Sequence, residues 1–83
     1  MGQALSDKML AALKVCEVPF NERVPWDVIE CLSIKEGIPY KVAWRRLEKA
    51  SDRGYLDYGT SIKGAWLTPE GKAALDEARS LSS

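Results

Sequence analysis

Basic and aromatic side chains gather in one stretch of the sequence, between Pro39 and Gly64. This stretch holds six basic residues against three acidic ones, while the rest of the chain holds six against nine, so the whole chain has no net charge. Phosphate groups are neutralised by nearby cations and not by the total charge of a chain. The chemistry that this pattern predicts is therefore the binding of a polyanion on one face of a small protein.

Catalytic or metal chemistry has few candidate residues. The chain contains no histidine, the commonest general base near neutral pH and the commonest metal ligand. Cys16 and Cys31 lie fifteen positions apart, without the close spacing of redox or metal motifs, so we expect reduced apolar thiols, with a disulfide as the alternative. Asp76 and Glu77 are expected on a solvated helix face. We predict a cytoplasmic protein that is not an enzyme, holds no metal or cofactor and does not enter membranes.

The elements that must position the basic stretch form one small domain, since the chain has 83 residues. Apolar side chains at three-to-four spacing predict four helices. The first begins at Ser6 as its N-cap and continues through Cys16; the second has Pro25 in its first turn, an apolar stripe that includes Trp26, and ends at Gly37. The third follows Pro39, buries Ala43, Leu47 and Ala50, and ends at Gly54. The fourth begins at Pro69 behind Thr68 as its cap and carries the apolar stripe Ala74, Leu75, Ala78 and Leu81.

Short extended segments separate some of these helices. Alternation over residues 55–58 and 65–67, with the glycine-bracketed loop 59–64 between them, predicts a two-stranded hairpin. A further extended piece is expected at residues 22–24, ahead of the second helix. The serine-rich residues 79–83 are expected to fray. The prediction is thus an α+β fold: a three-helix bundle, a two-stranded hairpin and a C-terminal helix.

Two motifs carry a resemblance to a known family. The stretch RRLEKASDRGYL at residues 45–56 resembles the end of a recognition helix and the first strand of a wing. The stretch LTPEGKAAL at residues 67–75 resembles the segment that closes the wing and starts the last helix. Together they are similar to the winged helix-turn-helix superfamily, in its small prokaryotic and phage regulators, over residues 24–75.

The resemblance implies a DNA-binding regulator of transcription with no cofactor, whose third helix enters the major groove while the wing touches the backbone. It places the contacts to double-stranded DNA on the first half of the third helix, one turn further along, and in the wing. The implied DNA-binding residues are Tyr40, Lys41, Trp44, Arg45, Lys49, Thr60, Ser61 and Lys63.

Other interpretations of these residues stay open. Arg45 lies opposite the core face and is expected either to read guanine or clamp phosphate, or to be a solvated surface arginine. Tyr40 and Trp44 are four apart, so they either contact a base or pack as a pair against the second helix.

The alternative function is a module for protein contacts within a larger complex. Strand alternation leaves Trp66 on the exposed face of the hairpin, where it would meet a partner or pack over Tyr55 or Asp57. The C-terminal helix is expected to pack on the first helix in a monomer or to pair with its copy in a homodimer.

Overall fold

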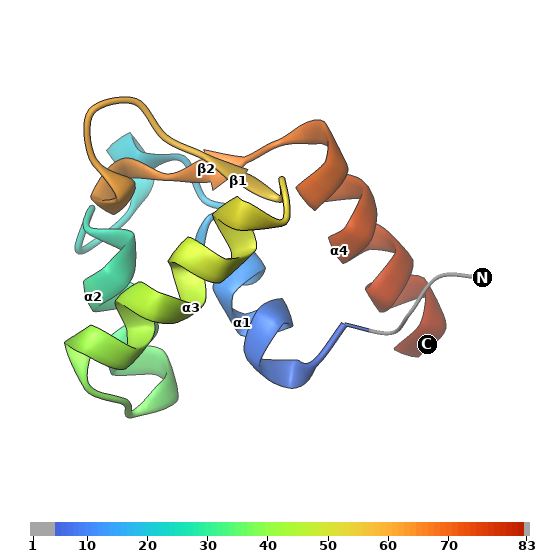
Figure 1. Ribbon diagram of the computed structural model, residues 1–83, viewed down its shortest axis with the longest axis horizontal. Coiled ribbons are helices and arrows are strands. Elements are labelled where there is room, and N and C mark those ends of the chain that lie inside the picture. Colours follow the sequence, from blue (N-terminus) through green and yellow to red (C-terminus); the bar gives the residue numbers. More distant parts are fainter. Residues whose placement is uncertain (1–4, 83) are drawn as a thin grey trace.

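The computed structural model describes residues 5–82, which form an α+β fold with four α-helices and one two-stranded antiparallel sheet (Figure 1). The helices are α1 (Asp7–Val15), α2 (Val28–Glu36), α3 (Tyr40–Asp52) and α4 (Pro69–Ser82). The strands are β1 (Leu56–Asp57) and β2 (Trp66–Leu67), and short 3₁₀ helices η1 (Phe20–Glu22) and η2 (Ile62–Gly64) lie in the connections. The predicted order of three helices, a hairpin and a last helix is confirmed.

The first three helices pack around a common apolar core. In α3, the three residues that the helical spacing assigned to the core, Ala43, Leu47 and Ala50, are completely buried. Burying a leucine or isoleucine contributes about 1.5–3 kcal/mol. The largest fully buried side chains of the core are Leu13, Ile29, Leu32, Leu47, Leu75 and Val28. Because one side of α3 is occupied by the core, its opposite side is left for solvent or a ligand.

The start of α2 differs from the prediction. Asp27 is the N-cap, and its Oδ1 accepts hydrogen bonds from the backbone N–H of Ile29 at 2.9 Å and of Glu30 at 3.3 Å. The helix therefore begins at Val28, and Pro25 and Trp26 precede it. Trp26 lies outside the apolar stripe to which it was assigned and is 51% exposed. Asp27 satisfies two of the N–H groups that a helix start leaves unpaired, and α2 therefore begins after Asp27 and not at Pro25.

The extended piece expected at residues 22–24 is not formed. Residues 20–22 form η1, and in the described part of the chain the sheet consists of β1 and β2 alone. Arg23 explains the local structure, because its side chain is only 7% exposed and donates to three backbone carbonyls. The chain here curls around a buried guanidinium instead of extending.

The hairpin has the predicted alternation. Leu56 lies opposite Leu67, and Asp57 lies opposite Trp66. Leu56 is buried while Trp66 is 49% exposed, which confirms the outward orientation expected for the tryptophan. The hairpin thus presents one apolar face to the core and one face to solvent.

Three hydrogen bonds join the end of α3, the hairpin and the start of α4. Gly54 has φ of 82°, the left-handed conformation predicted for the residue that stops α3. The Thr68 hydroxyl donates to the Gly54 carbonyl at 2.6 Å and accepts from the Gly71 N–H at 3.0 Å. The Thr68 N–H donates to the Tyr55 carbonyl at 3.0 Å. Thr68 is therefore the predicted cap of α4 and also fixes that helix to the α3–β1 turn.

The C-terminal helix α4 packs on α1 and β2 within the same chain (Figure 1). Arg79 donates to both carboxylate oxygens of Glu17, at 2.7 and 2.8 Å, and this hydrogen bond is the main cause that lowers the pKa of Glu17. Residues 79–82 continue α4, while Ser83 and the side chain of Leu81 lie outside what the structure describes. Among the described helices, none is long and apolar enough to span a bilayer.

Candidate nucleic-acid interface

The outer side of α3 carries two adjacent lines of side chains, because residues three and four apart lie above one another on a helix. One line is Lys41, Arg45, Glu48 and Asp52, and the other is Val42, Arg46, Lys49 and Arg53. The first line ends in two carboxylates, whereas the second is basic from the middle of the helix to its end. In the second half of α3, acidic side chains therefore follow one line and basic side chains follow the other.

The basic line forms one wall of a depression between α3 and the start of α1. Its volume is about 310 Å³. The lining residues are Ser6, Lys8 and Met9 from the α1 side and Val42, Arg45, Arg46, Lys49 and Arg53 from the α3 side. Five of these eight residues are basic and none is acidic. The charged side chains that line the depression are therefore all cationic.

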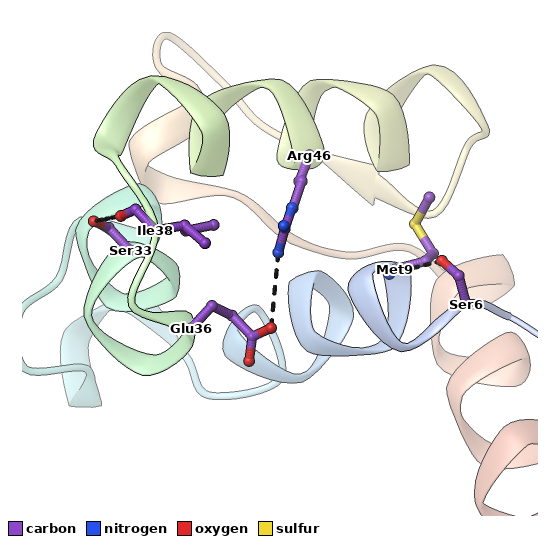
Figure 2. Close-up of polar contacts among 6 residues, drawn as sticks. All are labelled: Ser6, Met9, Ser33, Glu36, Ile38 and Arg46. Carbon is purple, nitrogen blue, oxygen red and sulfur yellow. Dashed lines mark hydrogen bonds and ion pairs between the residues drawn. The ribbon is translucent and has the colours of Figure 1, made fainter.

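Two of the lining residues are held by contacts of their own (Figure 2). The Ser6 hydroxyl accepts the Met9 N–H at 3.2 Å and so caps α1. Arg46 points from α3 toward the end of α2, where its Nη1 lies 3.7 Å from Oε1 of Glu36. Within residues 5–82, the only other ion pair below 4.0 Å joins Arg79 to Glu17. Lys8, Arg45, Lys49 and Arg53 are all exposed and lack a carboxylate at that distance within the described chain.

Five of the sequence-predicted site residues lie exposed on α3, Tyr40 among them, and the structure divides the other four. Arg45 and Lys49 line the depression, while Lys41 and Trp44 do not. Lys41 shares its line with Glu48 and Asp52. Only Arg45 and Lys49 are thus brought together with further cations.

The predicted hairpin residues lie elsewhere. Thr60 and Ser61 are exposed and Lys63 is half-buried in the loop, and none of the three lines the depression. The Ser61 hydroxyl accepts the Lys63 N–H at 3.3 Å and caps η2. The loop reaches over α2, against which η2 packs (Figure 1). These residues therefore belong to a second surface, beside α2.

Tyr40 is held at the junction of α2 and α3. Its hydroxyl donates to Oδ2 of Asp27 at 2.8 Å, so both oxygens of the α2 cap are used. Its ring meets Trp44 edge-on, with centroids 6.1 Å apart and planes at 79°. The pairing of these two aromatic side chains is confirmed, and a DNA contact for either remains a prediction. Desolvation, followed by the bond to Asp27, raises the pKa of the Tyr40 phenol to about 12.

Replacing Tyr40 with phenylalanine should lower the free energy of unfolding by about 1 kcal/mol, because a hydrogen bond to a buried carboxylate is lost. Urea denaturation followed by circular dichroism measures the change. Tyr58→Phe is the matched control, since Tyr58 is an exposed tyrosine in the hairpin. Equal stability of the Tyr40→Phe variant and the wild type would show that the bond to Asp27 contributes nothing.

The difference in stability between the wild type and Tyr40→Phe should depend on pH. The phenol of Tyr40 has a folded-state pKa raised from 10.0 to about 12. Its contribution to stability is therefore complete below about pH 10 and is lost as the pH rises toward 12. The difference between wild type and Tyr40→Phe should shrink over that interval, and phenolate absorbance should show one tyrosine ionising late.

Three basic residues of the depression, Lys8, Arg46 and Arg53, are absent from the sequence-predicted set. Arg46 and Arg53 could have been found, because with Lys49 they repeat at spacings of three and four on one flank of the helix. Lys8 has no such signal. Its position depends on how α1 packs across α3, which local patterns do not reveal.

The two cysteines lie away from this surface and are both free thiols. Cys16 is buried, and burial raises the pKa of its thiol to about 12. Cys31 is half-buried, its pKa is raised mainly by desolvation, and its Sγ donates to the Pro25 carbonyl at 3.0 Å. Protonated thiols of this kind are poor nucleophiles. Among the described residues, no three Cys, Asp or Glu side chains gather in a way that could hold a metal.

Comparisons of the chain with protein-family models, with curated proteins and with solved structures find no match. The charge and geometry of α3 and its surroundings are therefore the features that indicate a function. Those features are a cationic line on an exposed helix, a depression without acidic lining residues, and a hairpin beside α2.

Proposed function

We propose that the protein binds duplex DNA through the outer side of α3, as a small winged-helix regulator of transcription. The observation that carries the proposal is the exposure of Arg45 and Lys49 opposite the buried side of α3. A guanidinium reads the edge of guanine in the major groove or clamps a phosphate, and an ammonium binds phosphate as a point charge. These side chains are placed on a rigid helix whose other side is anchored in the core.

The arrangement of elements supports the same proposal. α2 and α3 are joined by a tight turn in which Gly37 has φ of 63°. In helix-turn-helix proteins the first part of the second helix of the pair approaches base edges, which here brings Lys41 and Arg45 to the groove. Thr60, Ser61 and Lys63 would then lie toward the backbone as the wing.

The two carboxylates on α3 limit how the helix docks. Glu48 and Asp52 are exposed in its second half. Carboxylates facing phosphates cost binding energy, so only the first two turns are expected to enter the groove. This orientation brings Lys41 and Arg45 into the groove and keeps Glu48 and Asp52 outside it.

Titration of a fluorescently labelled mixed-sequence duplex, read by anisotropy at low salt, tests the proposal. We expect a dissociation constant no weaker than about 10⁻⁵ M, because non-specific affinities of about 10⁻⁴–10⁻⁶ M at physiological salt become tighter at low salt. Arg45→Ala should weaken binding roughly tenfold, because one charge-assisted contact to a base or to a phosphate is lost. Lys72→Ala is the matched control, because it removes an exposed cation from α4. Absence of binding at protein concentrations on the order of tens of micromolar would refute the proposal.

A second candidate function, capture of a protein partner, is favoured by the exposure of the tryptophans. Trp26, Trp44 and Trp66 are 51%, 40% and 49% exposed. Exposed tryptophans often anchor protein interfaces. Under this alternative, Arg45→Ala leaves the function intact, whereas Trp66→Ala or Trp44→Ala abolishes partner capture. The opposite pattern supports DNA binding.

A further inference from the structure

The depression between α1 and α3 concentrates charge that the chain as a whole lacks. The sequence has twelve basic and twelve acidic residues. Five of the basic residues line this one depression, which leaves seven against twelve acidic residues over the rest of the protein. Such a concentration of like charge destabilises the folded state unless an anion offsets it. The arrangement therefore calls for a functional explanation.

A neighbouring depression provides an internal comparison. It lies between α1 and α2, has the same volume of about 310 Å³, and also contains two lysines, Lys14 and Lys35. Its lining includes Asp7 and Glu36, so its charges balance. The lining of the depression beside α3 includes no carboxylate. A concave surface of one sign raises the local potential and attracts ions of the opposite sign.

We propose that the depression between α1 and α3 is a phosphate-binding site, formed by Lys8 from α1 together with Arg45, Lys49 and Arg53 from α3 and its end. The assignment of these phosphates to one strand of the DNA backbone rests on the proposed function. The DNA interface then extends from α3 onto α1, on the side of α3 away from Glu48 and Asp52.

Arg46 has a different part in this site. Its guanidinium is drawn toward Glu36 at the end of α2 (Figure 2), and this contact partly neutralises it. The four ligand-binding cations are exposed, whereas Arg46 is half-buried. Arg46 therefore shapes the wall of the depression and joins α3 to α2, and the phosphates contact the other four cations.

The salt dependence of duplex binding tests the site. Each phosphate contact adds about 0.9 to the slope of log affinity against log salt, so removing Lys8 and Arg53 should reduce the slope by about two. The variant Lys8→Gln/Arg53→Gln keeps Arg45 and Lys49. The matched control Lys14→Gln/Lys35→Gln removes the same charge from the balanced depression. We expect the control to keep the wild-type slope, and equal slopes for both variants would overturn the site.

Titration with inorganic pyrophosphate, followed by amide chemical shifts, separates the sources of phosphate. The proposal is supported in full by two results together. The first is amide shifts near Lys8 and Arg53 that vanish in Lys8→Gln/Arg53→Gln, and the second is the reduced slope of log affinity against log salt in that variant. Pyrophosphate shifts without any duplex binding would refute the DNA-binding function and the backbone assignment while supporting a site for free phosphates. If pyrophosphate causes no shifts and the variant keeps the wild-type slope, the phosphate site is overturned, even if the wild type binds DNA.

Discussion

Replacing Gly71 with alanine should lower the free energy of unfolding by about 3 kcal/mol, although Gly→Ala within a helix is ordinarily stabilising. Gly71 lies buried in the first turn of α4, and a Cβ added there would overlap the backbone carbonyl oxygen of Tyr55 and lie 2.9 Å from its carbon. A backbone group cannot rotate away as a side chain does. The α4 start and the α3–β1 turn would have to separate.

The separation would also break hydrogen bonds. The Tyr55 carbonyl accepts the Thr68 N–H, and the Thr68 hydroxyl bonds both the Gly54 carbonyl and the Gly71 N–H. Because these bonds hold the hairpin to α3, we expect the melting temperature of Gly71→Ala to fall by about 10–20 °C. Thermal denaturation followed by circular dichroism measures this fall.

Gly64→Ala is the matched control for this prediction. A Cβ at Gly64 meets nothing within 4 Å, and its φ lies outside the left-handed region. Its stability should therefore change by no more than about 1 kcal/mol, and any change should favour the folded state. A Gly71→Ala variant as stable as Gly64→Ala would show that the α4–Tyr55 approach is not rigid.

The fold was predictable where a local signal determines structure. The core side of α3 follows from the spacing of Ala43, Leu47 and Ala50, and the left-handed Gly37 and Gly54 mark helix ends because few other residues adopt that conformation. The start of α2 was mispredicted because two N-terminal signals compete. Pro25 suits a first turn, but Asp27 satisfies two N–H groups.

The candidate site was predictable in part for a similar reason. Arg45 and Lys49 follow from helix periodicity, as Arg46 and Arg53 could have done. Lys8 joins them only through the packing of α1 across α3, a contact between distant parts of the sequence. Such contacts leave no periodic trace in a single sequence, so the second wall of the depression could not be predicted.

Arg23 also makes contacts that local sequence patterns do not reveal. Its replacement is the second change that we expect to have a large effect. Its Nε donates to the Trp26 carbonyl at 3.0 Å, and its Nη1 donates at 3.2 Å to both Val18 and Ala65. One side chain thereby joins the segment after α1, the approach to α2 and the hairpin. A single arginine in a turn looks solvated in the sequence, because its acceptors are backbone atoms from three segments.

Arg23→Met should lower the free energy of unfolding by about 2–4 kcal/mol. Methionine keeps the length and apolar packing of the side chain but leaves three carbonyls without their donor, and each buried unsatisfied group costs about 1–3 kcal/mol. The relief of desolvation opposes this loss, since the guanidinium is buried and its Nη2 has no partner within the described chain. We expect the three lost acceptor contacts to outweigh that relief.

Urea denaturation of Arg23→Met, with Arg79→Met as the control, decides between these opposing effects. Arg79 is an exposed arginine that bonds Glu17 on the surface, so its loss should shift the urea midpoint only slightly. Hydrogen exchange gives a second measurement, because losing the bond to Ala65 should speed exchange in β1 and β2 before it affects α1–α3. Stability equal to or above that of the wild type would mean that the desolvation of Arg23 outweighs its three hydrogen bonds.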